Sequence, residues 1–407
     1  MAAAFVASAH ATRPALDDVA RPTLSRILHA IRTHLGMEVA FISEFVNGRR
    51  HFRYVDELQP GGPVQVGNSD PLEESYCARI VDGRLPELMA DACLNPEALT
   101  LAATRALPVG AHLSVPLRLK DGSVYGTFCC FSRSANHTLN DRDLGMMRVF
   151  ANMVVDQIQA DRARREVAQL IEAQIEAIFS ADGLAMVYQP IYDLGTGRVV
   201  GFEALARFTA EPYQPPDVWF SRAAVVGREI ELETRAIQLA LQALDALPPA
   251  VYLAVNASPE AIVKGQLSTA LRGQPLERLI VEVTEHHAVE RYEDIAAVMA
   301  PLQAQGLRIA IDDAGAGYAS FRHMLNRHPE IVKLDISITR GIDTDRSRRA
   351  LAAALRGFAS ETGCSIVAEG IETPAELSTL QALGISRAQG YHLGRPMALA
   401  QACALPF

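Results

Sequence analysis

The stretch "VVGFEALARF", residues 199–208, has the apolar residues of a buried strand and a glutamate in its middle. Phe202 and Phe208 belong to the apolar pattern that predicts the strand, yet Glu203 lies inside it. Arg207 follows on the same run. A carboxylate in a buried strand costs several kcal/mol unless a charge or a metal ion compensates for it. What Glu203 contacts therefore decides how this part of the chain works.

After Gly183, short apolar stretches alternate with helical stretches of about ten to fifteen residues. This alternation indicates βαβ units and a mostly parallel sheet. Eight candidate strands in about 220 residues predict an α/β fold, a closed (β/α)8 TIM-like barrel. The strands are "LAMVYQPIY" (184–192), "VVGFEALARF" (199–208), "VYLAVNAS" (251–258), "LIVEVTE" (279–285), "LRIAIDD" (307–313), "IVKLDI" (331–336), "CSIVAEG" (364–370) and "RAQGY" (387–391).

Seven successive strands of this predicted barrel finish with a polar residue. Strand ends converge on one face of a barrel, where active sites are built. Each residue alone has a simpler explanation, because Asn256 and Asp313 also fit helix caps and Asp335 fits a turn. Polar residues at the ends of seven successive strands are harder to explain as helix caps, because a cap does not need glutamate. The residues are Glu203, Asn256, Glu282 with Glu285, Asp312 with Asp313, Lys333 with Asp335, Glu369 and Gln389.

Several of these side chains are carboxylates, which would repel one another and take up protons if they gathered without a counter-charge. Divalent cations remove this difficulty. Carboxylate oxygens with an amide carbonyl suit Mg²⁺ or Mn²⁺, and not a thiolate site for Zn²⁺. The sequence therefore predicts that Glu203 meets a metal ion. The carboxylates are Glu203, Glu282, Asp312, Asp313 and Glu369.

Residues 183–400 resemble the EAL-domain phosphodiesterases, which hydrolyse cyclic di-GMP to the linear dinucleotide pGpG. The matching motifs occur in the order that the family has. They are "QPI" (189–191), "EALAR" (203–207), "VNAS" (255–258), "EVTE" (282–285), "DDAGAGYAS" (312–320), "KLD" (333–335), "AEGIE" (368–372), "QGY" (389–391) and "GRP" (394–396).

The resemblance implies two metal ions, Mg²⁺ or Mn²⁺, in each active site. The first would be held by Glu203, Asn256, Glu282 and Asp312. Asp312 would bridge to the second, which Asp313 and Glu369 would share. Two bridged cations lower the pKa of bound water, offset the phosphate charge and stabilise the leaving oxygen of an in-line displacement.

The resemblance also implies roles for residues around the metal ions. Lys333 and Glu369 would orient and deprotonate the attacking water, with Asp335 in support. Glu285 would brace the loop after the two aspartates. The substrate's phosphates and guanines would contact Gln189, Arg207 and Gln389. Among these, Arg207 is a cation suited to phosphate oxygens.

Two positions depart from the family pattern: Ala314, where an aromatic residue is usual, and Ala224, where relatives often have glutamate. Neither change removes a predicted ligand. Degenerate relatives lose the first glutamate, the lysine or the late glutamate, but Glu203, Lys333 and Glu369 are present here. An active phosphodiesterase is therefore expected. The alternatives are a non-catalytic cyclic di-GMP receptor that signals to a protein partner, and another metal-dependent barrel enzyme. No GGDEF-type motif occurs, which argues against cyclic di-GMP synthesis.

The N-terminal part of the chain predicts an α+β module. A helix follows Arg21–Pro22, and two hairpins turn at Asn47–Gly48 and at Lys120–Asp121–Gly122. The stretches "SYCARIVDGRLPEL", "GAHLSVPL" and "GSVYGTFCCFS" resemble a GAF domain, a sensory module that binds small molecules. An unidentified small-molecule ligand is therefore expected here. Cys77 lacks the following histidine of bilin-linking sites, and His112 is more readily a structural residue than a haem ligand.

A long helix is predicted from Leu139 onward. Apolar residues at a 3-4 spacing form a seam in it, and the favoured interpretation is a connector helix that also dimerises. The alternative is an amphipathic helix packed on its own domain. The seam residues are Leu144, Met147, Ala151, Val154 and Ile158, then Val167, Ile171, Ile175 and Ile178. A homodimer is expected through the connector and the loop region of the EAL domain.

The predicted domains are a disordered tail (1–20), a GAF-like sensor domain (21–158), a connector helix (159–181) and an EAL domain (182–407). The first residues lack the basic start of a signal peptide.

The composition excludes several classes of protein. The net charge of −9 over 407 residues argues against a DNA-binding surface. No run of about 18 apolar residues occurs, so no membrane span is expected. The six cysteines have no CxxC spacing, which favours reduced thiols and a cytoplasmic location. Cys129 and Cys130 would point to opposite faces of one strand, so they are not expected to pair.

Overall fold

The computed structural model describes residues 21–59, 61–62, 64–180, 183–283, 292–314 and 329–407. They form two compact units, unit 1 ending at Gln169 and unit 2 beginning at Leu170, each with its own hydrophobic cores. The boundary lies inside one helix, α5 (Asp141–Ser180). The finer domain limits given above stay a prediction.

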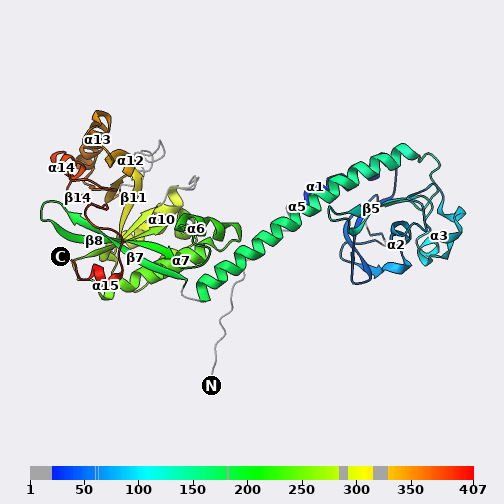
Figure 1. Cartoon of the computed structure of the whole chain (residues 1–407), viewed down its shortest axis with the longest axis horizontal. Helices are drawn as coiled ribbons and strands as arrows, with labels where there is room; N and C mark the ends of the chain where they lie inside the picture. The colour runs from blue at the N-terminus through cyan, green and yellow to red at the C-terminus, as the bar shows by residue number, and fades with distance from the viewer. Residues whose placement is uncertain (1–20, 60, 63, 181–182, 284–291, 315–328) are drawn as a thin grey trace, which may run out of the picture. The chain divides into compact units, whose positions relative to one another are not determined.

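Unit 1 is built on a six-stranded antiparallel sheet with the strand order β3-β2-β1-β6-β5-β4. Its strand β5 is labelled in Figure 1. Both predicted hairpins are present. At the first turn, Asn47 and Gly48 have φ angles of 51° and 72°, the pair of positive values that a tight hairpin turn requires. The strands are β1 (Val39–Val46), β2 (Arg49–Glu57), β3 (Ser69–Pro71), β4 (Leu88–Met89), β5 (His112–Arg118) and β6 (Val124–Phe131).

Helices cover both faces of this sheet, as the layers of an α+β module require. One core joins α1 and the first part of α5 to the sheet and contains Cys130. The core on the other face includes residues of α2 and α3 and contains Cys129. The two neighbouring cysteines therefore lie on opposite faces, as predicted. The helices are α1 (Arg21–Leu35), α2 (Tyr76–Val81), α3 (Pro96–Thr100), α4 (Ala102–Ala106) and α5.

Unit 2 is a closed eight-stranded barrel with the order β10-β11-β12-β13-β14-β7-β8-β9, and each of the eight predicted strands is present. One strand differs from a regular (β/α)8 barrel, because β7 is antiparallel to both neighbours and forms a long hairpin with β8 (Figure 1). The strands are β7 (Leu184–Asp193), β8 (Arg198–Phe208), β9 (Tyr252–Ala257), β10 (Leu279–Val283), β11 (Arg308–Ala314), β12 (Ile331–Leu334), β13 (Ser365–Ala368) and β14 (Arg387–Ala388).

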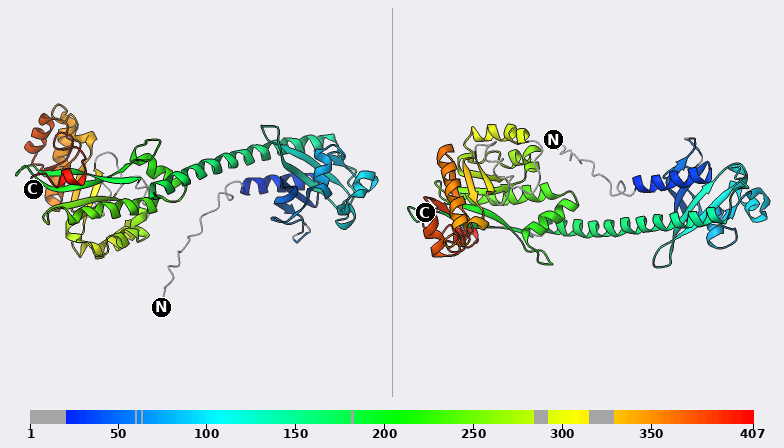
Figure 2. Two further views of the ribbon diagram at one scale, coloured as in Figure 1. Left: turned by 60° about the horizontal axis from the view of Figure 1, so that its bottom comes forward. Right: turned by 90° about the horizontal axis from the view of Figure 1, so that it is seen from above.

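Helices lie outside the barrel strands, and the orange α13 and α14 are seen at its edge in two further views (Figure 2). Apolar residues such as Leu355 and Leu380 pack these helices onto the sheet. No helix in the described part of the chain is long and apolar enough to cross a membrane. The helices are α6 (Pro216–Val225), α7 (Glu229–Leu241), α8 (Pro259–Val263), α9 (Gln266–Ala270), α10 (Tyr292–Gln303), α12 (Ile336–Thr339), α13 (Arg346–Thr362), α14 (Pro374–Ala382) and α15 (Leu399–Ala402).

Most of the apolar seam of α5 is not the free surface that the favoured interpretation required. Met147 and Val154 are fully buried in the core of unit 1, and Ile175 is fully buried in a core of unit 2. The dimer-seam interpretation is therefore wrong for these three residues, whereas Val167, another residue of the predicted seam, is 55% exposed. The alternative, a helix packed on its own domain, describes them, because burying such residues inside one chain removes the same apolar surface from water.

Candidate functional site

A buried lysine stands among four carboxylates where the barrel strands end. Lys333, at the end of β12, has only 2% of its surface exposed. Its Nζ lies 2.7 Å from both Glu282 Oε2 and Glu369 Oε1. It lies 3.3 Å from Asp312 Oδ1 and 3.6 Å from Glu203 Oε2. These five residues, called the Lys333 cluster below, come from five different strands or the turns that follow them.

Glu203 contacts two amide side chains as well as this ammonium. Gln389 Nε2 donates a hydrogen bond of 2.6 Å to Glu203 Oε2 and one of 3.1 Å to Glu369 Oε1. Asn256 Nδ2 lies 3.5 Å from Glu203 Oε1. The partners of Glu203 among the described residues are therefore Lys333, Gln389 and Asn256.

The position of Glu203 corrects one expectation. It does not end its strand, because β8 continues to Phe208 as an arm of the β7–β8 hairpin. The part of β8 that pairs with β9 runs from Gly201 to Glu203. Glu203 therefore stands where β8 leaves the barrel wall, which brings it level with the true strand ends.

Burial and charge oppose each other in this cluster. Burial alone would lower the pKa of Lys333, but the carboxylates around it raise that pKa well above its ordinary value. Burial raises the pKa of Glu282, against the lowering effect of Lys333, and Glu203 and Asp312 raise it further. Burial also raises the pKa of Glu369, again against Lys333. One ammonium is too little positive charge for four neighbouring carboxylates.

The donor set fits hard divalent cations. Its surplus charge is negative, its donors are oxygens, and Gln389 Oε1 is buried with no hydrogen-bond partner among the described residues. In the present arrangement Lys333 is the cation that the carboxylates contact. No group of three or more His, Cys, Asp or Glu within the described ranges is arranged as metal ligands. The metal-ligand roles stay a prediction.

The remaining predicted residues lie outside these contacts. Gln189 pairs in register with Glu203, and its Nε2 donates to the carbonyl of Gly394 at 3.2 Å. Arg207, farther along β8, donates to the carbonyl of Ala206. Asp335 caps α12 by accepting a hydrogen bond from the backbone of Ser337, a structural role different from the turn considered for it. Glu285 and the side chain of Asp313 lie outside the described residues.

Two buried glutamates that hold the site's loops were not predicted. Glu233 on α7 accepts a 2.6 Å hydrogen bond from the backbone N–H of Ser258, just after Asn256. Glu376 accepts backbone hydrogen bonds from Gly341, Glu372 and Thr373. Sequence signals existed, because Glu233 interrupts the apolar face of α7 and "TPAE" (373–376) is a capping box.

Unit 1 has a hollow that bears on the expected GAF ligand. It has a volume of about 600 Å³ and includes Val39, Leu58, Leu107 and Arg133 in its lining. Apolar walls with a few polar groups are usual for small-molecule sites. The existence of a ligand stays a prediction.

Comparison with known proteins finds a matching domain family for each half of the chain. The EAL domain family matches residues 171–396, and the GAF domain family matches residues 20–158. A cyclic di-GMP phosphodiesterase of Pseudomonas aeruginosa is 28% identical over 72% of this chain and 51% of its own length. An uncharacterised protein of Azorhizobium caulinodans is 32% identical over 53% of this chain and 31% of its own.

Solved structures give the same result for unit 2. The PaMucR phosphodiesterase in complex with c-di-GMP is 26% identical and superposes with a TM-score of 0.52. The match covers 57% of this chain and 99% of that one. This chain spans only 31% and 51% of the two curated relatives named above. The EAL match covers more than half of the 407 residues, so the protein belongs to the EAL domain family, with a GAF domain before its EAL domain.

Proposed function

We propose that unit 2 hydrolyses cyclic di-GMP to pGpG with Mg²⁺ or Mn²⁺ as cofactor. The observation that carries this proposal is the Lys333 cluster, which gathers four carboxylates around one ammonium at one end of a barrel. The chain's likeness to a cyclic di-GMP phosphodiesterase and to a c-di-GMP-bound structure supports the choice of substrate.

Each residue of the cluster has a task in this proposal. Glu203, Asn256, Glu282, Asp312, Asp313 and Glu369 hold the two cations. When bound, the cations offset the phosphate charge and lower the pKa of water. Glu369 accepts the proton of the attacking water, and Lys333 fixes its carboxylate through the 2.7 Å contact. Arg207 and Gln189 bind the phosphate and guanine groups, together with Gln389.

A direct assay tests the proposal. The purified full chain is incubated with cyclic di-GMP, with and without Mg²⁺ or Mn²⁺, and the products are separated by chromatography. Formation of pGpG that depends on the metal ion is expected. Glu203→Gln should lower the rate at least about a hundredfold, because it removes a ligand charge while keeping the shape. The control Glu260→Gln changes an exposed glutamate on α8, paired with Lys264, and should leave the rate unchanged.

Two outcomes of the same assay would contradict the proposal. Tight binding of cyclic di-GMP without product would favour a non-catalytic receptor. Cleavage of another phosphodiester but not of cyclic di-GMP would favour a different metal-dependent enzyme.

We also propose that unit 1 regulates this activity and that two copies of the chain associate through α5. The helix begins in the core of unit 1 and ends in a core of unit 2, so a shift of it changes both. Its exposed side has a second series of residues at alternating spacings of three and four, as in a two-stranded coiled coil. This exposed stripe is Met146, Val149, Met153, Asp156, Ala160, Ala163, Val167 and Leu170.

A further inference from the structure

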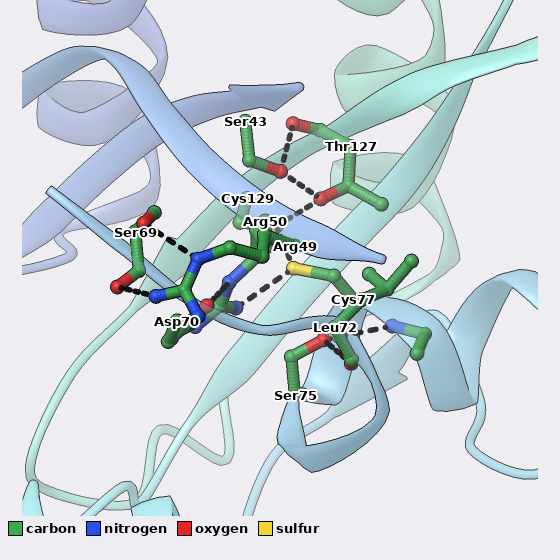
Figure 3. Close-up of polar contacts among 11 residues, drawn as sticks. Ser43, Arg49, Arg50, Ser69, Asp70, Leu72, Ser75, Cys77, Thr127 and Cys129 are labelled. Atoms are coloured by element: carbon green, nitrogen blue, oxygen red, sulfur yellow. Dashed lines mark hydrogen bonds and ion pairs between the residues drawn. The ribbon is translucent and has the colours of Figure 1, made fainter. Parts of the chain in front are cut away.

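Two cysteines that are far apart in the sequence lie side by side inside unit 1. Cys77 on α2 and Cys129 on β6 are fully buried, and their sulfur atoms are 3.5 Å apart (Figure 3). A disulfide bond has an S–S distance of about 2.05 Å, so pairing requires a relative movement of about 1.5 Å. Rotation of the two side chains with a small adjustment of the short helix α2 can supply that movement.

An arginine faces the first of these sulfurs. Arg50 Nη1 lies 3.0 Å from Cys77 Sγ, while the same guanidinium holds Asp70 through Nε at 3.0 Å and through Nη2 (Figure 3). The guanidinium is also stacked over Phe52, with its carbon 4.7 Å from the ring centre. Its position is therefore fixed from three sides, and it presents a positive charge to the sulfur of Cys77.

Hydroxyl groups surround the second sulfur. Ser114 Oγ is 2.8 Å and Thr127 Oγ1 is 3.2 Å from Cys129 Sγ. Ser43 Oγ is in turn 2.9 Å from Thr127 Oγ1 (Figure 3). A structural cysteine in a core is normally surrounded by apolar groups, as Cys130 is on the other face of the sheet. The polar surroundings of this pair are therefore unusual for a buried position.

These surroundings shift the pKa values of the two thiols in opposite directions. Burial alone would raise the pKa of Cys77, but its hydrogen bond with Cys129 and the charge of Arg50 outweigh burial and lower it. Burial and the hydrogen bond with Cys77 raise the pKa of Cys129. One member of the pair is thus suited to be a thiolate nucleophile and the other to remain a thiol that can resolve a sulfenic acid.

We propose that Cys77 and Cys129 form a peroxide-reactive pair that is converted reversibly into a disulfide. The Cys77 thiolate attacks one oxygen of hydrogen peroxide and breaks the O–O bond. This gives a Cys77 sulfenic acid and hydroxide, which takes up a proton to become water. The sulfur of Cys129 then attacks the sulfenic sulfur, the S–S bond forms, and water leaves with the proton of the Cys129 thiol. Two electrons pass from the sulfurs to the peroxide, and a dithiol reductant reverses the step.

Access to the pair is limited but not absent. Both sulfurs are buried, yet the side chain of Asp70, which holds Arg50, is 39% exposed. The pair therefore lies one layer of side chains below the surface. We expect a reagent the size of hydrogen peroxide to reach it through local opening and a bulky disulfide reagent to be excluded. Cys93, which is exposed, has no such protection.

The test uses the reduced full-length chain. It is treated with hydrogen peroxide, alkylated under denaturing conditions, digested without reductant and mapped by mass spectrometry. A Cys77–Cys129 linked peptide is expected, in amounts that the control variants Cys130→Ser and Cys93→Ser do not change. A bulky aromatic disulfide reagent should modify Cys93 and leave the pair untouched. Recovery of Cys77 and Cys129 as free thiols while Cys93 is oxidised would overturn the proposal.

Two variants separate the roles of the pair without requiring any phosphodiesterase activity. Cys129→Ser, treated with hydrogen peroxide while folded, should leave a sulfenic acid on Cys77, which dimedone labels when the protein is then unfolded in its presence. Arg50→Gln should slow formation of the disulfide about fivefold at pH 5, near the pKa of Cys77, where a pKa increase of one unit lowers the thiolate fraction from about one half to about one tenth. If Arg50→Gln unfolds unit 1, the Cys129→Ser labelling still decides. Absence of the dimedone adduct in a folded Cys129→Ser protein contradicts the proposal. Because the readout is a mass, its failure is distinct from a failure of cyclic di-GMP hydrolysis.

Discussion

At the residue scale, the ammonium of Lys333 has the role that a metal ion has in many carboxylate sites. Its positive charge allows negatively charged side chains to lie close together. Its ammonium contacts four carboxylates, two of them at 2.7 Å, and 2% of the residue is exposed. Removing one partner of a buried charge pair leaves the others uncompensated, which costs about 3–5 kcal/mol. The cluster therefore depends on this single lysine for both its stability and its arrangement.

We expect Lys333→Met to lower the free energy of unfolding of unit 2 by about 3–5 kcal/mol when no divalent cation is added. Hydrolysis of cyclic di-GMP should fall at least about a hundredfold, because the general base is no longer held in place. Trp219 is the single tryptophan of the chain and lies in unit 2. Urea unfolding followed by its fluorescence measures the change in the free energy of unfolding. The control Lys264→Met removes an exposed lysine paired with Glu260 and should change neither quantity. Equal stability of Lys333→Met and the unchanged protein would mean that the carboxylates do not need this ammonium.

His112 makes the stability of unit 1 depend on pH. Burial, and then the nearby charge of Arg50, lower the pKa of His112 from 6.5 to about 3. Below about pH 6.5 the unfolded chain takes up a proton at this residue that the folded chain does not accept until about pH 3. Stability is therefore lost as the pH falls through this window.

Between pH 7 and pH 5, this single histidine should remove about 2 kcal/mol from the free energy of unfolding of unit 1. Hydrogen exchange of β5 and β6 peptides at the two pH values measures the loss. His112→Phe keeps an aromatic ring for stacking against Tyr76, whose ring centre is 4.6 Å away, and removes the titrating group. The variant should lack this part of the pH dependence. An identical pH dependence in both proteins would assign the effect to other groups.

At the scale of elements, the turn after β13 determines where Glu369 lies. Gly370 has a φ angle of +65°, and a Cβ atom there would lie 2.4 Å from the side chain of Ile336. The main-chain oxygen of Glu369 accepts a hydrogen bond from the hydroxyl of Thr339. The turn is therefore closely packed on α12 and tolerates only glycine.

Gly370→Ala should displace Glu369 and lower turnover at least about tenfold with a small effect on the binding of cyclic di-GMP. The matched control is Gly357→Ala in the interior of α13, where a Cβ atom meets nothing within 4 Å. That change should stabilise unit 2 by about 0.5–1 kcal/mol, since alanine favours a helix. Kinetic measurements on both variants compare them, and unchanged turnover of Gly370→Ala would show that the turn does not position the glutamate.

The sequence predicted the barrel elements well because their signals are local. Each strand is a short apolar run between turn or helix signals, and polar residues at strand ends meet by the geometry of any barrel. The hairpin arm of β8 was missed, since its apolar residues continue past the barrel without a break. Burial of Glu233 was missed for a related reason, because its partner Ser258 lies on a distant element.

The seam of α5 illustrates a limit of periodicity. A 3-4 spacing indicates that one side of a helix is apolar, but it does not predict what packs against that side. Val154 has the spacing of a dimer seam, and in the structure it is fully buried among residues of unit 1. The antiparallel direction of β7 is likewise decided by its pairing with β14 and β8, which a single strand sequence does not encode.

For the whole molecule, the exposed stripe of α5 defined above decides whether two copies associate. Val149 and Val167 are 60% and 55% exposed, and Leu170 is 65% exposed, which is costly for apolar residues of one helix face. Pairing with a second copy would bury them at the heptad spacing that two-stranded coiled coils use. The buried residues of the predicted seam cannot serve this purpose, so Val154→Asp should unfold unit 1 rather than separate a dimer.

We expect the full chain to be a dimer in solution and Val167→Glu to weaken it at least about tenfold, because two like charges would face each other across the helix pair. Multi-angle light scattering over a range of concentrations measures the dissociation. Gln169→Glu is the matched control: it adds the same charge two residues away, on an exposed position outside the stripe, and should leave the dimer intact. If regulation by unit 1 passes through paired α5 helices, Val167→Glu should also remove any effect of unit 1 on turnover while Gln169→Glu keeps it. A chain that is monomeric at all concentrations, or a Val167→Glu dimer as stable as the control, would exclude the stripe as the contact between copies.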